Sequence, residues 1–222
     1  MPPQLTLYRA NKACSLVPHV LLRELKIPFT SVLMEIGPEG VQAADGSITR
    51  DQYREINPNG LVPALRVDND TILTENPAIL TYIASLAPER QVFGRTDLER
   101  AQVYQWICWL SGTLHGKAYL SILRPARFAD DPGAQAEIVA KGRKAIANCY
   151  ERIESSLDGE HAVGDVFTIA DVYVYIFWEW GYRNSFDMAK HYPRYGRLAR
   201  KVEQMESVRE AIEVEGLPLQ FP

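Results

Sequence analysis

The first part of the chain alternates between two hydrophobic periods. Apolar and polar residues alternate in 5–10, which predicts a short β-strand. In 16–25 the apolar residues recur at helical spacing, and Ser15 stands where an N-cap belongs. A second extended run covers 29–36, whereas 37–47 is rich in turn residues and charge and is expected to form an exposed loop.

Two further extended runs, 61–67 and 71–74, are separated by a short polar turn and predict a β-hairpin. Asn76 then stands as the N-cap of a helix, with Pro77 at the first helical position. The resulting order, βαβ followed by ββα, predicts a mixed four-stranded sheet covered by helices. Residues 1–86 are therefore expected to form an α/β domain.

No β-pattern follows the segment 87–95, which is expected to be a linker. We therefore expect 96–222 to be an all-α domain, so that the fold class is α/β followed by all-α. Thr168 and Asp171 have the spacing of a capping box at the start of a buried helix. Helical periods are found at roughly 96–123, 133–157, 169–184, 191–204 and 206–214.

Charge and composition exclude several functional classes. The 222 residues include 24 Lys and Arg against 28 Asp and Glu, a net charge of −4, which disfavours a nucleic-acid-binding module. No apolar run approaches the roughly 20 residues that a membrane span needs, and the N-terminus lacks the apolar core of a signal peptide. A cytoplasmic protein that binds neither nucleic acid nor membrane is expected.

The chain has three cysteines, Cys14, Cys108 and Cys149, an odd number that is typical of reduced thiols in an intracellular protein. Cys108 and Cys149 lie among apolar helical residues and are expected in the core. The four histidines have no zinc-ligand spacing with one another or with the cysteines. No metal is expected.

Three motifs resemble those of one superfamily, the soluble glutathione transferases. Gly60–Leu65 is similar to the loop before the third strand of that family, in which the proline, here Pro63, is cis. Thr74–Asn76 resembles the glutamate-plus-small-polar signature, and Phe167–Asp171 resembles the capping box of the helical domain. The resemblance implies a thioredoxin-like first domain, glutathione as co-substrate, and a homodimer.

Within the superfamily, the start of the first helix resembles the beta class. Ala13–Leu16, with Pro18-His19 after it, is similar to the beta-class helix that begins with a cysteine. His115 resembles the histidine that faces this cysteine from the second domain. The beta-class lysine that holds the glycine carboxylate of glutathione is missing, and Arg50 is the nearest substitute.

A glutathione transferase must stabilise a thiolate, and a helix N-terminus with a hydroxyl or thiol donor can do this. Cys14 and Ser15 both stand at that position, and Tyr8 at the end of the first strand is a third donor. A thiol at a helix N-terminus near Lys12 and Arg9 is expected to have a lowered pKa, which would favour a mixed disulfide of Cys14 with glutathione.

The other contacts to glutathione follow from backbone chemistry and charge. An exposed strand edge at Val62, beside Pro63, can pair with the cysteinyl backbone of glutathione. Asn76 and the helix N-terminus can receive the γ-glutamyl carboxylate, and Glu75 can receive the ammonium group. Without the resemblance, Pro63 would be read as a plain edge-strand proline. Glu75 and Asn76 would then be expected only to cap a helix.

The second domain is expected to supply the electrophile site. His115 can hydrogen-bond the sulfur or relay a proton near neutral pH. Four aromatic residues are candidates for an apolar pocket in the cleft between the domains, although most aromatic residues at helical spacing pack in the core. They are Trp109, Tyr119, Trp178 and Tyr182.

The sequence therefore predicts a glutathione transferase, a detoxification enzyme in which the thiolate of glutathione attacks a small apolar electrophile. Serine-assisted conjugation and thiol–disulfide exchange through Cys14 both remain open. One alternative is a glutathione-dependent isomerase or a biosynthetic glutathione-adding enzyme. Another is a non-catalytic interaction module of the same fold.

Overall fold

The computed structural model describes residues 2–221. The chain forms two compact units, each with its own core. The first unit consists of Met1–Phe93 together with Arg200–Pro222, and the second of Gly94–Ala199. The first break lies inside the segment expected to be a linker, whereas the sequence had placed the last segment with the helical domain.

The first unit is built on a mixed sheet with the order β3-β2-β1-β4-β5. β1 and β2 run parallel, and the other neighbouring pairs run antiparallel. The mixed sheet is confirmed, but it has five strands in the place of the predicted four. The strands are β1 (Leu5–Arg9), β2 (Thr30–Gly37), β3 (Gly40–Ala43), β4 (Ala64–Val67) and β5 (Thr71–Thr74).

The additional strand, β3, lies in the segment that was predicted to be an exposed loop. It forms a tight hairpin with β2, in which Gly37 pairs with Gly40 and Met34 pairs with Ala43. Val41 and Ala43 are buried. The prediction was wrong because two apolar positions in a four-residue strand give too short an alternation to stand out from turn residues.

The helix α2 (Arg50–Ile56) was also missed by the sequence analysis. Thr49 caps it in a capping box with Gln52, and Tyr53 is its buried residue. A helix with a single buried side chain has no apolar stripe, so its sequence carries no helical period. Tyr53 packs in a cluster with Tyr8 and Met34, on the sheet face that α2 covers.

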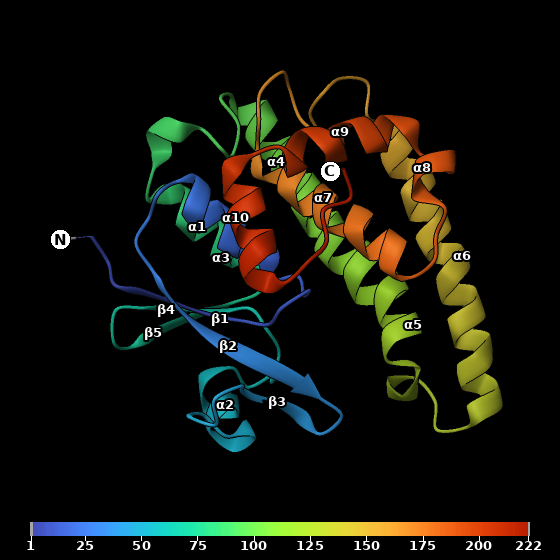
Figure 1. The fold of residues 1–222 in the computed structure, drawn as a ribbon, viewed down its shortest axis with the longest axis horizontal. Coiled ribbons are helices and arrows are strands. Elements are labelled where there is room, and N and C mark those ends of the chain that lie inside the picture. Colours follow the sequence, from blue (N-terminus) through green and yellow to red (C-terminus); the bar gives the residue numbers. More distant parts are fainter. Residues whose placement is uncertain (1, 222) are drawn as a thin grey trace. The chain divides into compact units, whose positions relative to one another are not determined.

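Three other helices pack together on the opposite side of the strands (Figure 1). They are α1 (Leu16–Glu24), α3 (Asn76–Ser85) and α10 (Glu206–Glu215). Because α10 packs on α1, the end of the chain belongs to the first unit, where it buries Val208 and Ile212. This arrangement confirms the thioredoxin-like topology and adds a C-terminal helix to it.

The second unit is all-helical, as predicted, except that the expected helix over 96–123 has a π-helical middle. A π-helix of ten residues is uncommon, since π-turns usually occur singly and often at functional sites. The elements are α4 (Asp97–Trp109), the π-helix η2 (Leu110–Tyr119), α5 (Leu120–Leu123), α6 (Pro132–Ser156), α7 (Ile169–Arg183), α8 (Met188–His191) and α9 (Pro193–Glu203), which runs on into the first unit. Short 3₁₀ turns occupy Pro88–Arg90 and Pro125–Arg127.

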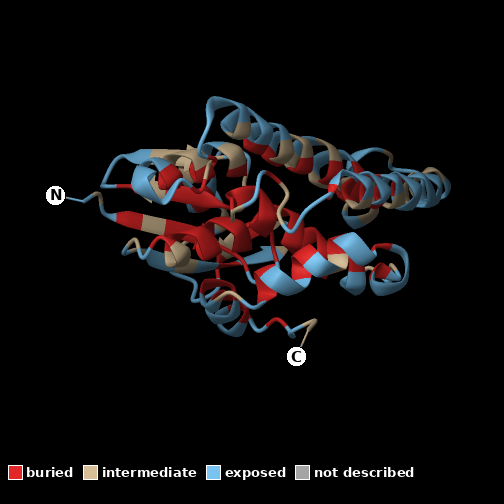
Figure 2. Ribbon diagram, turned by 90° about the horizontal axis from the view of Figure 1, so that it is seen from above, coloured by how far each residue is buried: buried red, intermediate tan, exposed pale blue. Residues whose placement is uncertain are grey.

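The core of the second unit is centred on α7, which is buried from Ile169 to Gly181. The predicted capping geometry is confirmed, since the backbone N–H of Thr168 donates to Asp171 Oδ2 at 2.7 Å. Figure 2, in which buried residues are red, shows that many of the other helices carry both a buried and an exposed face. Within residues 2–221, no helix has both the length and the apolar composition that crossing a bilayer requires.

The two cysteines of this unit differ in burial. Cys149 on α6 is buried, as predicted, and Cys108 on α4 is exposed. The prediction for Cys108 was wrong because the buried side of α4 is formed by Val103 and Ile107. Cys108 is the next residue after Ile107, so its side chain is turned by about 100° around the helix, away from the buried side. All three cysteines are free thiols.

Candidate active site

The structure brings Cys14 together with two other predicted site residues. Cys14 lies in the loop between β1 and α1 and is 6% exposed. Its thiol donates to the backbone oxygen of Val62 at 3.6 Å, and Asn76 Nδ2 donates to the backbone oxygen of Cys14 at 3.1 Å. Three segments that are distant in sequence therefore meet at this cysteine.

The Val62–Pro63 peptide bond is cis, as the resemblance implied. The loop that carries it is anchored at Leu61, whose backbone oxygen accepts from Tyr53 Oη at 2.8 Å and from Asn57 Nδ2 at 2.6 Å. The helix α2, which sequence analysis missed, thus supports the loop that faces Cys14.

Glu75 and Asn76 form the junction between β5 and α3. Glu75 is the N-cap residue, so the prediction that Asn76 caps the helix was wrong by one position. The Asn76 side chain is instead directed at the Cys14 backbone. Glu75 is exposed and has φ +67°, a strained conformation for a residue other than glycine, of the kind that is concentrated at functional sites.

Ser15 occupies the N-cap position of α1 as predicted, but its side chain does not cap the helix. Ser15 is fully buried, and its hydroxyl donates to the backbone oxygen of Ala10 at 3.0 Å and accepts from the Ala10 N–H at 3.1 Å. The hydroxyl therefore ties the start of α1 to the end of β1.

The expected lowering of the Cys14 pKa was wrong. Burial, with a smaller contribution from the negative charges of Glu75 and Glu215, raises the pKa of the Cys14 thiol to about 12. Hydrogen bonds from the Cys14 backbone N–H and from Asn76 oppose this shift without cancelling it. At neutral pH the thiol is therefore protonated, which agrees with its role as a donor to Val62.

Tyr8, the third donor predicted from sequence, lies on β1 and is 4% exposed. Its hydroxyl accepts a hydrogen bond from Arg66 Nε at 3.0 Å, and its ring lies 5.8 Å from that of Tyr53. The structure thus places Tyr8 on the face of the sheet that α2 covers.

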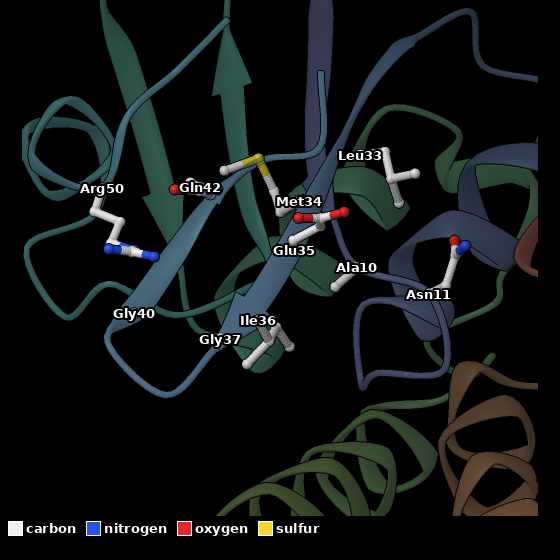
Figure 3. A pocket seen from close by; sticks show the side chains of 10 residues that line it. All are labelled: Ala10, Asn11, Leu33, Met34, Glu35, Ile36, Gly37, Gly40, Gln42 and Arg50. Atoms are coloured by element: carbon white, nitrogen blue, oxygen red, sulfur yellow. The ribbon is translucent and has the colours of Figure 1, made fainter. Parts of the chain in front are cut away.

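A pocket of about 500 Å³ opens along β2 and β3, beside the loop that follows β1. Figure 3 shows Asn11 at one side of it and Arg50 at the other, with Glu35 on the strand between them. Arg50 is paired with Glu39. Among the predicted site residues, Arg50 lines this pocket. Asn11 and Glu35 gave no signal in the sequence because the hairpin of β2 with β3 was not foreseen.

In the second unit, His115 lies on the π-helix and is surrounded by aromatic rings. Its ring centroid is 5.1 Å from that of Trp180 and 6.1 Å from that of Phe177. Burial, together with the positive charge of Arg124, lowers the pKa of His115 to about 4. The imidazole is therefore neutral at pH 7.

The four aromatic residues predicted for the electrophile pocket fall into two groups. Tyr119 and Trp178 are 0% and 1% exposed, so both belong to the core. Tyr182 is 36% exposed, and Trp109 lines a pocket of about 320 Å³ in which the Arg152 guanidinium lies 4.5 Å from the Trp109 ring. Trp109 and Tyr182 are thus the two with accessible surface.

Comparisons with known proteins agree with this architecture. The family described as glutathione S-transferase, N-terminal domain, matches residues 13–86, and the one described as glutathione S-transferase, C-terminal domain, matches residues 113–206. A sphingomonad glutathione S-transferase, solved in complex with glutathione, has 32% identity and a TM-score of 0.82, covering 96% of this chain and 100% of that chain.

Two curated relatives extend the comparison. Glutathione S-transferase GstA of Escherichia coli O157:H7 is 29% identical over 207 residues, which make up 92% of this chain and 96% of that protein. Maleylacetoacetate isomerase maiA of Aspergillus fumigatus is 27% identical over 220 residues, 94% of this chain and 90% of that protein.

The first unit is thus a thioredoxin-like domain with a cysteine at the head of its first helix and a cis-proline loop beside it, and an all-helical unit completes the chain. The chain belongs to the soluble glutathione transferase superfamily.

Proposed function

We propose that this glutathione transferase binds glutathione along the Val62–Pro63 loop and activates its thiol beside Cys14 for attack on an apolar electrophile. The proposal rests on one observation. Cys14, just before α1, is hydrogen-bonded both to Val62 in the cis-proline loop and to Asn76 at the start of α3. Backbone groups of Val62 would pair with the cysteinyl part of glutathione as a short added strand.

The two charged ends of glutathione require partners of opposite charge. At one end, the N-terminus of α3 offers backbone N–H groups to the γ-glutamyl carboxylate, and the exposed carboxylate of Glu75 offers a partner for the ammonium group. At the other end, Arg50 is assigned to the glycine carboxylate because it lines a pocket that is within the usual size range of small-molecule sites.

Cys14 is assigned as the donor that stabilises the thiolate of glutathione. Its protonated thiol, which donates to the Val62 backbone oxygen at 3.6 Å, would donate to the glutathione sulfur instead. The Ser15 hydroxyl is fully buried and is held by two hydrogen bonds with Ala10. The thiolate then forms a carbon–sulfur bond to the electrophile, and a leaving group departs or a proton is taken up. Thiol–disulfide exchange through Cys14 is the less favoured reaction, because it requires the Cys14 thiolate and burial opposes that form.

The second unit is assigned to the electrophile. Trp109 and Tyr182 offer accessible aromatic surface, and neutral His115 is assigned as a hydrogen-bonding partner of the reacting sulfur. We further propose a cytoplasmic homodimer with a role in detoxification, on the basis of the superfamily and the reduced thiols.

The first experiment is a calorimetric titration of the protein with reduced glutathione up to millimolar concentrations, followed by a conjugation assay with aromatic and α,β-unsaturated electrophiles. We expect saturable binding and conjugation in the unmodified protein and in a Cys149→Ala control. Absence of both binding and thermal stabilisation by glutathione would overturn the proposal in favour of an interaction module.

An isomerase is the second candidate, and the likeness to maleylacetoacetate isomerase maiA is the observation that favours it. Isomerisation would use the same thiolate, which adds across a double bond and is then expelled after rotation. An assay of cis–trans isomerisation with maleylacetoacetate separates the two reactions. We expect conjugation to exceed isomerisation, and the opposite result would assign the isomerase activity.

A further inference from the structure

The helix α10 places a buried carboxylate against the loop that carries Cys14. Glu215, the last residue of α10, has a fully buried side chain. Its Oε2 accepts the backbone N–H of Lys12 at 3.0 Å, and its Oε1 lies 2.9 Å from His19 Nδ1. Arg9 Nη1 lies 3.9 Å from the same Oε1. The side-chain carboxylate of Glu215 thus contacts both the Cys14 loop and α1.

The hydrogen bonds of His19 define its protonation. Arg23 Nε donates to His19 Nε2 at 3.0 Å, and a guanidinium can only donate, so Nε2 is the acceptor nitrogen. The proton of the neutral ring is therefore on Nδ1, from which it is donated to Glu215. Burial lowers the pKa of His19, which agrees with a neutral ring. Arg9 then provides the positive charge opposite Glu215.

The N–H that Glu215 receives belongs to a residue in an unusual conformation. Lys12 has φ +62°, in the left-handed region that residues other than glycine adopt only when their surroundings hold them there. Lys12 stands two residues before Cys14, so its conformation directs the chain into the start of α1. The Asn11 side chain is held next to it by Arg9 Nη1 at 2.7 Å.

We propose that Glu215 is a positioning residue of the active site, which holds Lys12 in its left-handed conformation and thereby places Cys14 at the head of α1. The proposal rests on the proposed function in one respect, namely that Cys14 acts on the sulfur of glutathione. Glu215 acts through its contacts with Lys12, His19 and Arg9.

The same carboxylate acts on Cys14 through its charge. The charges that act on the thiol include Glu75 at the start of α3 and Glu215 on α10. Glu215 is faced in turn by Arg9 on β1 and by neutral His19 on α1. Glu215 and Glu75 oppose ionisation of the thiol. Removing the charge of Glu215 is therefore expected to make the Cys14 thiol more acidic.

Two substitutions separate position from charge. Glu215→Gln removes the charge and leaves a single acceptor oxygen for two donors, whereas Glu215→Asp keeps the charge and withdraws the carboxylate by one methylene. The matched control is Glu203→Gln, because Glu203 is also buried and accepts two backbone N–H groups, those of Gln220 and Phe221, at 3.0 and 2.6 Å. These two hydrogen bonds hold the C-terminal tail, Gln220 and Phe221.

The first readout is the pH dependence of alkylation of Cys14 by iodoacetamide, in a Cys108→Ser, Cys149→Ser background in which Cys14 is the single thiol. In Glu215→Gln the midpoint is expected to fall, because a negative charge that opposes ionisation of the thiol is removed. In Glu215→Asp and Glu203→Gln it is expected to stay unchanged. This readout does not depend on glutathione, so it tests Glu215 even if the proposed function fails in the calorimetric titration.

The second readout is kcat/KM for glutathione. Both Glu215 variants are expected to lose about tenfold to a hundredfold, because a small displacement of a reacting group has effects of that size. Glu203→Gln is expected to retain the activity of the unmodified protein. If the Glu215 variants lower the melting temperature as Glu203→Gln does, but change neither kcat/KM nor the midpoint, the positioning role is overturned. If Glu215→Gln does not fold, Glu215→Asp with loss of kcat/KM at an unchanged midpoint still supports it.

Discussion

Cys14 and His115, the two predicted catalytic groups that lie in different units, are held in different ways. The Cys14 loop is fixed by directed hydrogen bonds. Ser15 and Glu215 accept backbone N–H groups of Ala10 and Lys12, and Asn76 donates to the backbone oxygen of Cys14. His115 lies on a π-helix against the rings of Trp180 and Phe177. Directed bonds fix an atom's position and charge environment, while ring packing excludes water.

This difference has a consequence for experiments. Substitutions around Cys14 are expected to change chemistry more than stability, because each hydrogen bond there places or polarises one group. Substitutions around His115 are expected to change stability and its pH dependence first.

Replacing Cys14 by Ala is expected to reduce the rate of conjugation by about a hundredfold to a thousandfold, the usual loss when one donor to a developing or stabilised anion is removed. Cys14→Ser, which restores a donor, is expected to recover part of that loss. Steady-state kinetics with saturating glutathione measures both. An unchanged rate of conjugation in Cys14→Ala would assign the donor role to another group. It would also contradict the expectation that substitutions around Cys14 change chemistry more than those around His115.

Acidification is expected to destabilise the protein through His115. Its pKa is about 4 in the folded protein, against an ordinary value of 6.5, because burial and then the charge of Arg124 disfavour the imidazolium. Stability from this group is complete above about pH 6.5 and is lost as the pH falls toward 4, since the unfolded chain then binds the extra proton. At about pH 4 the free energy of unfolding is expected to be lower by about 3 kcal/mol.

Denaturant unfolding at several pH values between 4 and 7 measures this loss. His115→Phe keeps a ring among the aromatic neighbours and is expected to flatten the pH dependence. An equally steep dependence in that variant would assign it to other groups, of which His19 is the first because burial lowers its pKa as well.

Replacing Asn76 by Ala is expected to raise KM for glutathione about tenfold, because it removes a donor to the Cys14 backbone and an amide assigned to the γ-glutamyl end. Asn184→Ala is the matched control, since Asn184 Nδ2 also donates to a backbone oxygen, that of Trp180, at 2.8 Å. Calorimetric affinity for glutathione should fall in the first variant and not in the second.

The smallest effect is expected for Arg50. Its guanidinium is 40% exposed and paired with Glu39, so solvent screens its interaction with a bound carboxylate. Arg50→Ala is expected to raise KM for glutathione about threefold with little change in kcat. A titration with the γ-glutamylcysteine fragment, which lacks the glycine residue, should show no difference between Arg50→Ala and the unmodified protein if the assignment holds.

Sequence analysis recovered those features that a few neighbouring residues encode. The helix after Thr168, the hairpin at 61–74 and the motif around Pro63 carry their signals within short segments, and the structure confirms them. It missed β3 and α2, whose few buried side chains give no period. It also had no means of seeing that Glu215 contacts the loop that carries Cys14.

By itself, the sequence determined the order of the elements apart from β3 and α2, the change from an α/β to an all-helical part, and the family. Only the tertiary structure decided what surrounds Cys14, which is why the expected low pKa gave way to a raised one. The physical reason is that propensity and capping depend on neighbours in the chain, whereas burial and charge depend on neighbours in space. Lys12 and Glu215, which share a hydrogen bond, are 203 positions apart.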